Sequence, residues 1–422
     1  MKILWLCNII LPDMANLMSI QGSSGGGWLV GLLENLRKVD GVELVICSPI
    51  IKSKEIIKFD IDNIRYYGFP KNIIDPTKYD KNVEYAFKEI LSLEEPDIVH
   101  IFGTEFPHTL SMTKAFNRPD RTIINIQGLT SIIAQHYLNG IPYSFQRRFT
   151  FRDFVKKDNL IRQKYKFEKR GKYEIEAIKN INNVIGRTSW DKACTLEINN
   201  KIDYYFCNET LRSKFYANKW SLDKCEKYSI FISQGSYPVK GLHFMIEAMP
   251  SLVKRFPKVH LYIAGDDITI SKTLRDKLKR SSYGKYIKFL INKYKLNKYI
   301  TFLGNLDEEE MCCRFLNSNV FVSPSIIENS PNSLCEAMIL GVPCVASYVG
   351  GVPDMLTHNK EGFLYQTDAP YMLTYYISKI FEDEKKTHEL SKNSILRAEK
   401  THDKEKNCSR IIEIYNQVIN KE

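Results

Sequence analysis

Two carboxylates, Glu328 and Glu336, are separated by seven residues in SPSIIENSPNSLCEAMILGVPCVASYVGGVPD, which runs from Ser323 to Asp354. Two neighbouring acids could act as an acid and base pair in catalysis. However, Ser330 and Pro331 are typical of a helix N-cap followed by proline at the first helical position. This start places Glu328 in a loop and Glu336 inside the helix, so the two carboxylates do not share one helical face.

The residues on either side of this helix start predict an extended ligand. Glu328 follows the apolar run NVFVSPS, and ligands in open α/β sheets bind beyond the carboxyl ends of parallel strands. The free backbone amides of Asn332, Ser333 and Leu334 would form a helix N-terminus suited to an anion such as a diphosphate. A ligand with a hydroxyl-rich group, a diphosphate and a ribose would use the loop, the amides and Glu336. That description fits a nucleotide sugar.

Short apolar runs alternate with helical patterns along the whole chain. This alternation predicts βαβ units, and therefore parallel sheets covered on both faces. The predicted strands are Ile3 to Ile10, Glu43 to Cys47, Ile98 to Ile101, Thr122 to Ile126, Asn183 to Ile185, Ser229 to Ser233, Val259 to Ala264, Ile300 to Phe302, Asn319 to Val322 and Pro343 to Ser347.

A chain of 422 residues predicts two domains. The first and last five strands are separated by a mixed, charged segment from Tyr204 to Tyr228. We expect Rossmann-like domains at residues 1–211, on the acceptor side, and 212–402, on the nucleotide-sugar side. Residues 403–422 predict a final helix that packs back towards the first domain, because they carry one apolar stripe at helical spacing, formed by Ile411, Ile412, Tyr415, Val418 and Ile419.

The composition indicates a cytoplasmic protein. No apolar run reaches the 18 to 20 or so residues that span a bilayer, and the ten cysteines contain no C-x-x-C pair. The net charge is +11, and basic and aromatic residues gather between Gln146 and Glu174. That stretch could be a solvated face, a surface for anionic lipids on the inner face of the plasma membrane, or, least favoured, a nucleic-acid patch. The lipid interpretation depends on Arg147, Arg148, Lys156, Lys157, Lys169 and Arg170.

The motif E-N-S-P-N-S-L-C-E-A-M-x-x-G-x-P-x-V resembles the donor site of retaining glycosyltransferases of family four, the glycogen-synthase-like group. Further landmarks occur in the family's order, among them PVKGLHFMIEAM, LYIAGDD, ITFLGNL, GGVPD and EGFLY. The resemblance is strong over the carboxyl half and looser over the amino half. It implies the GT-B fold, in which two doubly wound domains face a central cleft.

The resemblance also implies roles for individual residues. Glu328 would contact the transferred sugar, and Lys240 would neutralise the leaving diphosphate. The ribose would bind Glu336, and the phosphates would approach Asn332, Ser333 and Leu334. The glycines at positions 25, 26 and 27 (Gly25, Gly26 and Gly27) would bring the backbone close to donor and acceptor.

The family resemblance further predicts what the reaction uses. We expect transfer with retention from a UDP- or GDP-sugar to a glycan or lipid-linked glycan, in cell-surface polysaccharide synthesis. The nucleotide sugar is the substrate, and we expect no cofactor, no metal and no nucleic-acid partner.

Some positions depart from the family pattern. Gln234 and Gly235 stand where members often have an arginine before the lysine, and Gln127 stands where the amino half often has a histidine. Gln127 could still donate to a sugar hydroxyl. Arg187 and Asp191, in VIGRTSWDKACTL, could bind the acceptor or could be a helix cap with a local ion pair.

Other functions explain less of the chain. A dehydrogenase would have G-x-G-x-x-G directly after the first strand, which is absent here. Asp60 and Asp62 form a D-x-D typical of metal-dependent glycosyltransferases, but their segment predicts a hairpin or edge strand. The alternative from another class is a non-enzymatic basic scaffold that binds an anionic membrane or nucleic acid.

Overall fold

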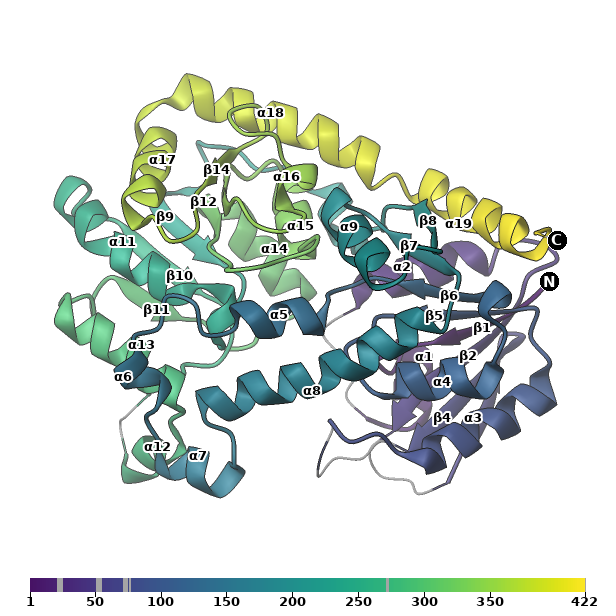
Figure 1. The fold of residues 1–422 in the computed structure, drawn as a ribbon. Helices are drawn as coiled ribbons and strands as arrows, with labels where there is room; N and C mark the ends of the chain where they lie inside the picture. The colour runs from purple at the N-terminus through teal and green to yellow at the C-terminus, as the bar shows by residue number, and fades with distance from the viewer. Residues whose placement is uncertain (21–25, 51–54, 71–74, 76, 271–272, 422) are drawn as a thin grey trace. The chain divides into compact units, whose positions relative to one another are not determined.

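Two mainly parallel sheets organise the chain in the computed structural model, which describes residues 1–422 except 21–25, 51–54, 71–74, 76, 271–272 and 422 (Figure 1). The chain folds into two compact units. Unit 1 comprises Met1–Ile132, Lys166–Arg212 and His402–Glu422, and unit 2 comprises Ile133–Tyr165 and Ser213–Thr401.

Unit 1 holds an eight-stranded sheet in the order β3-β4-β2-β1-β5-β6-β7-β8. All neighbours pair in parallel except β3, which is antiparallel to β4 at the edge. The strands are β1 (Lys2–Leu6), β2 (Glu43–Ile50), β3 (Ile57–Ile61), β4 (Ile64–Pro70), β5 (Ile98–Phe102), β6 (Thr122–Asn125), β7 (Asn183–Gly186) and β8 (Asp203–Phe206).

Helices cover both faces of this sheet. One core cluster joins the sheet to α2 and α19, and another joins it to α3, α4 and the end of α8, with α9 beside them. The helices that lie in or run into unit 1 are α1 (Pro12–Leu17), α2 (Gly27–Leu36), α3 (Lys81–Glu94), α4 (His108–Phe116), η1 (Pro119–Arg121), α5 (Thr130–His136), α8 (Leu160–Lys179), α9 (Ser189–Ile198) and α19 (Lys404–Ile419).

The last helix, α19, belongs to unit 1. Ile411, Tyr415 and Val418 of the predicted stripe are buried, together with Ile414. The Tyr415 hydroxyl accepts a hydrogen bond from Trp5 Nε1 at 3.0 Å and lies 2.7 Å from His100 Nδ1. These contacts fix the helix on β1 and β5.

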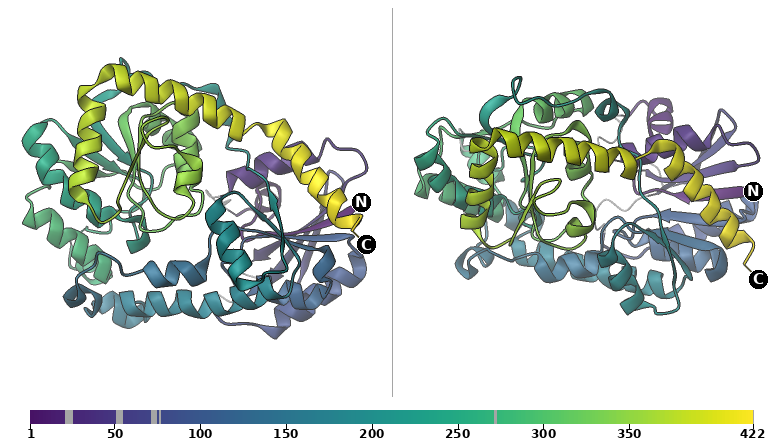
Figure 2. Two further views of the ribbon diagram at one scale, coloured as in Figure 1. Left: turned by 45° about the horizontal axis from the view of Figure 1, so that its top comes forward. Right: turned by 90° about the horizontal axis from the view of Figure 1, so that it is seen from above.

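Unit 2 holds a six-stranded parallel sheet in the order β11-β10-β9-β12-β13-β14, and helices stack on both faces of it (Figure 2). Helices α11, α13 and α17 pack together over one face, whereas α14 and α15 contact the sheet and each other, and α18 packs on α15. The strands are β9 (Glu226–Ile232), β10 (His260–Ile263), β11 (Ile300–Phe302), β12 (Ser318–Ser323), β13 (Cys344–Ser347) and β14 (Phe363–Tyr365).

The helices of unit 2 are α6 (Tyr143–Gln146), α7 (Phe151–Lys156), α10 (Ser213–Ala217), η2 (Pro238–Lys240), α11 (Leu242–Arg255), α12 (Leu274–Lys279), α13 (Ser282–Lys293), α14 (Glu308–Leu316), α15 (Asn332–Leu340), α16 (Val352–Met355), α17 (Pro370–Glu382) and α18 (Glu384–Thr401).

The ten predicted strands are all present, and the D-x-D segment is the predicted edge hairpin, β3–β4. Two strands were missed. β8 lies in the segment expected to link the domains, and β14 is only three residues long. The first strand ends at Leu6 rather than Ile10.

The predicted domain limits need one correction, because residues 133–165 belong to unit 2 and not to the first domain. Gly140 adopts a φ of +75°, and a Cβ there would lie 2.7 Å from His243 Nε2. Phe145 packs on Tyr286 with ring centroids 4.8 Å apart. These contacts bury the segment against α11 and α13.

None of the helices in the described residues is long and apolar enough to cross a membrane. All ten cysteines are free thiols, as their irregular spacing predicts.

Candidate active site

Three loops meet at the carboxyl edge of the unit 2 sheet, where the sequence predicts the donor site. β12 lies between β9 and β13, and every residue of β12 is buried. The loop after β12 carries Glu328, and the turn after β9 carries Lys240. The fold therefore brings two residues 88 positions apart to one edge of the sheet.

Glu328 and Lys240 form a direct ion pair. Lys240 Nζ donates to Glu328 Oε1 at 2.5 Å, and Ser325 Oγ donates to the same oxygen at 2.9 Å. Burial lowers the pKa of Lys240, but the charges of Glu328 and Tyr237 and its hydrogen bonds to both outweigh burial, so the net shift is upward. Lys240 is therefore a permanent cation at this edge.

The backbone holds this ion pair in place. Gly241 has a φ of +68°, and a Cβ at this position would lie 1.8 Å from the carbonyl oxygen of Pro324. Ile326 N donates to Val239 O at 2.8 Å, and Gly351 N donates to Glu328 O at 3.0 Å. The loops after β9, β12 and β13 thus interlock around Glu328.

Helix α15 begins one residue later than the sequence predicts. Its N-cap is Pro331, with φ −68° and ψ 117°, and no side chain in the described part of the chain caps the helix. Ser330 is therefore not the N-cap. The amide of Leu334 is not free, because it donates to Pro331 O at 3.0 Å. Asn332 and Ser333 are the first two helical residues, whose amides have no acceptor within an α-helix.

Two buried polar atoms lie at the start of this helix. Across the described residues, Ser330 Oγ and Asn332 Oδ1 have no hydrogen-bond partner. Such groups are costly to bury unpaired and often mark a binding site. Glu336 is also buried, 6% exposed, one turn further along α15.

Comparison with known proteins identifies this region. Residues 213–397 match the family model of glycosyl transferases group 1. This part of the chain is a glycosyl transferases group 1 domain. The match confirms the predicted resemblance at that level.

Curated relatives match mainly over part of the chain. An uncharacterized glycosyltransferase of Methanocaldococcus jannaschii is 27% identical over 158 residues, which are 37% of this chain and 36% of that protein. A phosphatidyl-myo-inositol mannosyltransferase of Mycobacterium tuberculosis is 28% identical over 145 residues, 34% of each. The chain thus spans about a third of the length of these two relatives.

Solved structures match over the whole chain. The sucrose-phosphate synthase of Thermosynechococcus elongatus has a TM-score of 0.68 at 16% identity and covers 99% of this chain and 98% of its own. Anabaena HepE, in complex with UDP and glucose, has a TM-score of 0.67 at 16% identity and covers 99% and 100%. These likenesses show the GT-B fold predicted for the chain.

Unit 1, outside the group 1 domain, holds the predicted glycines. Gly26 has a φ of +81° and is the N-cap of α2, which begins at Gly27. A Cβ at Gly26 would lie 2.1 Å from Ile9 Cδ1, so packing as well as conformation requires glycine there. Gly25 lies outside the described residues.

The predicted acceptor-side residues are built into the interior of unit 1. Arg187 Nη1 lies 2.5 Å from Glu209 Oε2, and both side chains are less than 5% exposed. Asp191 forms a capping box with Thr188. The contacts are those of a cap and an ion pair, but the acid paired with Arg187 is Glu209.

Gln127 is connected to the same acid. Its Nε2 donates to Glu209 Oε1 at 2.6 Å and to Asn125 Oδ1 at 2.9 Å. Gln127 is partly buried, whereas Arg187 and Asp191 are buried. Of the three, Gln127 therefore keeps the most accessible position after its strand.

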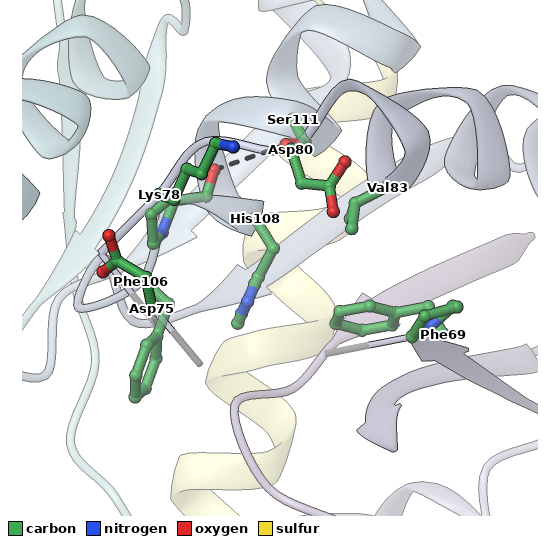
Figure 3. A pocket seen from close by; sticks show the side chains of 10 residues that line it. Phe69, Asp75, Lys78, Asp80, Val83, Phe106, His108 and Ser111 are labelled. Atoms are coloured by element: carbon green, nitrogen blue, oxygen red, sulfur yellow. Dashed lines mark hydrogen bonds between the residues drawn. The ribbon is translucent and has the colours of Figure 1, made fainter. Parts of the chain in front are cut away.

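A pocket in unit 1 was not predicted from the sequence. It opens where β4 and β5 end, beside the starts of α3 and α4 (Figure 3). Its walls combine aromatic, charged and hydroxyl side chains from residues Phe69, Pro70, Asp75, Lys78, Asp80, Val83, Phe106, Pro107, His108 and Ser111. The only signal in the sequence is that these residues follow apolar runs.

One side of this pocket carries a short polar chain. His108 Nε2 lies 2.6 Å from Asn8 Oδ1, and Asn8 Nδ2 donates to Glu105 Oε2 at 2.6 Å. Burial, opposed by a backbone hydrogen bond and assisted by the charge of Glu174, raises the pKa of Glu105 to about 7. His108 is thus part of a hydrogen-bonded chain at the edge of the pocket.

Proposed function

We propose that the chain is a glycosyltransferase that moves a sugar from a UDP- or GDP-sugar to a glycan or lipid-linked glycan. The observation that carries the proposal is the Lys240–Glu328 pair beside the start of α15, where the buried Ser330 Oγ has no hydrogen-bond partner among the described residues. A cation, helix amides and a free hydroxyl are together suited to a diphosphate.

The pair can serve both ends of the bond that breaks. An ammonium has three donors, and Lys240 uses two of them on Glu328 and Tyr237, so it retains one for a phosphate oxygen. Within the described residues, both hydrogen bonds to the Glu328 carboxylate go to Oε1, so Oε2 would accept from a sugar hydroxyl. We assign Glu328 to the transferred sugar and Lys240 to the leaving diphosphate.

The other donor-side roles follow along α15. The amides of Asn332 and Ser333 would contact the phosphates, and the backbone of Leu334 would lie beside them. Glu336 would accept from the ribose hydroxyls. Its position in α15, beyond Asn332 and Ser333, supports this role. We propose a metal-independent reaction in which Lys240 provides the positive charge.

The family's mechanism supplies the proposed stereochemistry. We propose that the acceptor attacks from the face that the diphosphate leaves, so that the anomeric configuration is retained. No separate base is needed on this route, because the acceptor proton passes to the donor phosphate. Proton NMR of the first product would test it, since an inverted anomer excludes this route.

The acceptor proposal rests on the relatives. The names of two of them, the M. tuberculosis mannosyltransferase and the phosphatidylinositol N-acetylglucosaminyltransferase gpi3 subunit of Schizosaccharomyces pombe, specify phosphatidylinositol acceptors. We propose a lipid-linked acceptor used in cell-surface polysaccharide synthesis, which the chain reaches as a cytoplasmic, peripheral protein. The contact with an anionic membrane would involve residues within 146–174. In unit 1, Gln127 and the glycines at the start of α2 would face the acceptor.

The decisive experiment compares two glutamine variants of unit 2. Purified protein is screened with UDP- and GDP-sugars for a rise in melting temperature, and the best donor is used for transfer assays. Glu328→Gln keeps the size of the side chain and removes its charge. We expect transfer to fall about 10² to 10³-fold, the range for one electrostatic group in an active site.

The matched control is Glu382→Gln, which breaks a surface ion pair with Arg255 in the same unit. It should transfer sugar at the normal rate. Full transfer by Glu328→Gln would refute the site, and a scaffold without enzymatic activity would show no transfer by the unmodified chain with any donor.

A further inference from the structure

Unit 2 exposes an unusual amount of apolar side chain on α7, on the loop before it and on the neighbouring helix α12. The two helices pack against each other. We call this surface the apolar tip. Its members are 48% to 78% exposed, and they are Phe149, Phe151, Phe154, Val155, Leu274 and Leu278.

The apolar side chains share one face of each helix. Phe151, Phe154 and Val155 stand at positions i, i+3 and i+4 of α7, and Leu274 and Leu278 stand at i and i+4 of α12. A surface helix normally turns such a stripe towards the core. Here the stripe faces outwards in both helices, which is typical of an interaction site.

The exposure of α7 is imposed by an internal anchor. Asp153 is fully buried and forms a capping box with Thr150. It also accepts a hydrogen bond from Ser282 N at 3.0 Å and one from the Ser282 hydroxyl. The opposite face of α7 is therefore tied to the start of α13, which leaves its aromatic face outside.

Basic side chains border the apolar tip. Arg147, Arg148, Lys156 and Lys157 are exposed beside α7, and Lys277 and Lys279 are exposed on α12. The acid within each helix has another role, since Asp153 of α7 is buried and Asp276 caps α12. Exposed aromatic and aliphatic groups within a basic border are the pattern of surfaces that bind anionic bilayers.

We propose that the apolar tip docks unit 2 on an anionic lipid bilayer, with Phe151, Phe154 and Leu274 in the interfacial layer. This inference rests on the membrane contact in the proposed function and narrows it to α7 and α12. A second copy of the chain is a poor occupant, because two basic borders would repel each other in a protein of net charge +11.

The inference also excludes two residues of the predicted basic stretch, Lys169 and Arg170, from the membrane contact. Lys169 Nζ lies 3.6 Å from Asp75 Oδ2, and Arg170 Nη1 donates to Glu105 O at 3.4 Å. Both residues belong to unit 1 and contact its residues. The two residues therefore provide a matched control for the charges that border the tip.

The test uses the full chain and vesicles of phosphatidylcholine, alone or mixed with phosphatidylglycerol. We expect sedimentation with the mixed vesicles only. The double change Phe154→Asp and Leu274→Asp should weaken it about tenfold or more, because each aspartate removes an inserted group and adds repulsion. The control is Tyr371→Asp with Leu396→Asp, at positions in unit 2 that are 70% and 58% exposed. It should sediment normally.

A second pair of variants tests the charges. Lys156→Glu with Lys157→Glu should weaken sedimentation and reduce its dependence on salt, whereas Lys169→Glu with Arg170→Glu should leave both unchanged. The proposal is overturned if the tip variants sediment normally. It is equally overturned if light scattering shows a dimer that Phe154→Asp dissociates, while the unmodified chain does not sediment with vesicles.

Failure here can be distinguished from failure of the proposed function. The tip double variant should keep its donor-induced rise in melting temperature in the absence of vesicles. Glu328→Gln should lose transfer and still sediment. Vesicle binding without any sugar transfer would support the proposed docking surface and refute the proposed enzymatic function.

Discussion

The carboxyl edges of the two sheets have the same place in their units and different chemistry. In unit 2 the edge pairs Lys240 with Glu328 and leaves Ser330 Oγ without a partner in the described part of the chain. In unit 1 the polar groups Asn8, Glu105 and His108 bond to one another, with aromatic rings beside them. A parallel sheet thus determines where a ligand can bind, and a few loop residues determine which ligand it is.

This contrast separates an edge suited to a negatively charged ligand from an edge whose polar groups are hydrogen-bonded to one another. The unit 2 edge carries a permanent cation and helix amides, whereas the acid of the unit 1 edge has a pKa near neutrality. Changes at the first edge should therefore act on catalysis, and changes at the second should act on stability and its pH dependence.

The largest effect is expected from Lys240→Ala. It removes the cation that would stabilise the leaving diphosphate and leaves Glu328 without its ion-pair partner. We expect kcat/KM to fall about 10³-fold or more. Lys214→Ala, which breaks an exposed ion pair with Glu309 in the same unit, is the control and should keep full activity. If Lys240→Ala keeps more than a tenth of normal kcat/KM, the edge does not act through this cation.

The next effect concerns the backbone behind the cation. Gly241→Ala would put a Cβ 1.8 Å from Pro324 O in a backbone with φ +68°. We expect a loss of about 3 kcal/mol or more of unfolding free energy in urea, since both strain and overlap oppose folding. Gly304 has φ +77°, and apart from its chain neighbours no atom of the described residues lies within 4 Å of its Cβ position. Gly304→Ala should therefore cost only about 1 to 2 kcal/mol. Equal losses would show that conformation alone requires glycine at position 241.

The sequence predicts the buried parts of the fold well. All ten predicted strands exist, because a strand covered on both faces needs a continuous apolar run. β8 was missed because it is an edge strand in which Asp203 and Phe206 are exposed, so it lacks that run. Residues 133–165 were misassigned because their contacts, such as Asn139 O with His243 Nε2 at 3.2 Å, are about 100 positions away.

The sequence likewise predicts some contacts of the candidate site residues and misses others. Glu328, Glu336 and Lys240 were predicted because they belong to a motif with known spacing, and the fold puts Glu328 and Lys240 in contact. The partner of Arg187 could not be found, since Glu209 is 22 positions away and no local pattern joins the two. The predicted start of α15 is one residue too early, because Pro331 has a helical φ but an extended ψ of 117°.

A pH effect distinguishes the unit 1 edge from the unit 2 edge. The pKa of Glu105 is raised from 4.5 to about 7, so between these values the folded chain holds a proton that the unfolded chain releases. Stability should fall as the pH rises through this window, with a slope of up to about 1.4 kcal/mol per pH unit, and then stay level. Glu105→Gln is neutral throughout and should lose this slope.

Urea unfolding at about pH 5, 6, 7 and 8 would measure this dependence of stability on pH. Glu382→Gln, at an exposed ion pair of unit 2, is the control and should keep the slope of the unmodified chain. Parallel curves for Glu105→Gln and the unmodified chain would mean that Glu105 is ionised throughout, and the contrast between the edges would then rest on geometry alone.

The smallest effect on stability is expected at the start of α15. Ser330→Ala removes a buried hydroxyl that has no partner among the described residues, so unfolding free energy should not fall. Thr188→Ala, at a side chain that caps α9, should cost about 1 kcal/mol. Titration with the donor nucleotide should give the reverse order. Ser330→Ala should raise Kd about tenfold or more, since one hydrogen bond to a charged group is worth about 1.5 kcal/mol or more, and Thr188→Ala should leave Kd unchanged. A loss of stability without a loss of affinity would make Ser330 a structural residue, and the anion site would then depend on Lys240 and the helix amides alone.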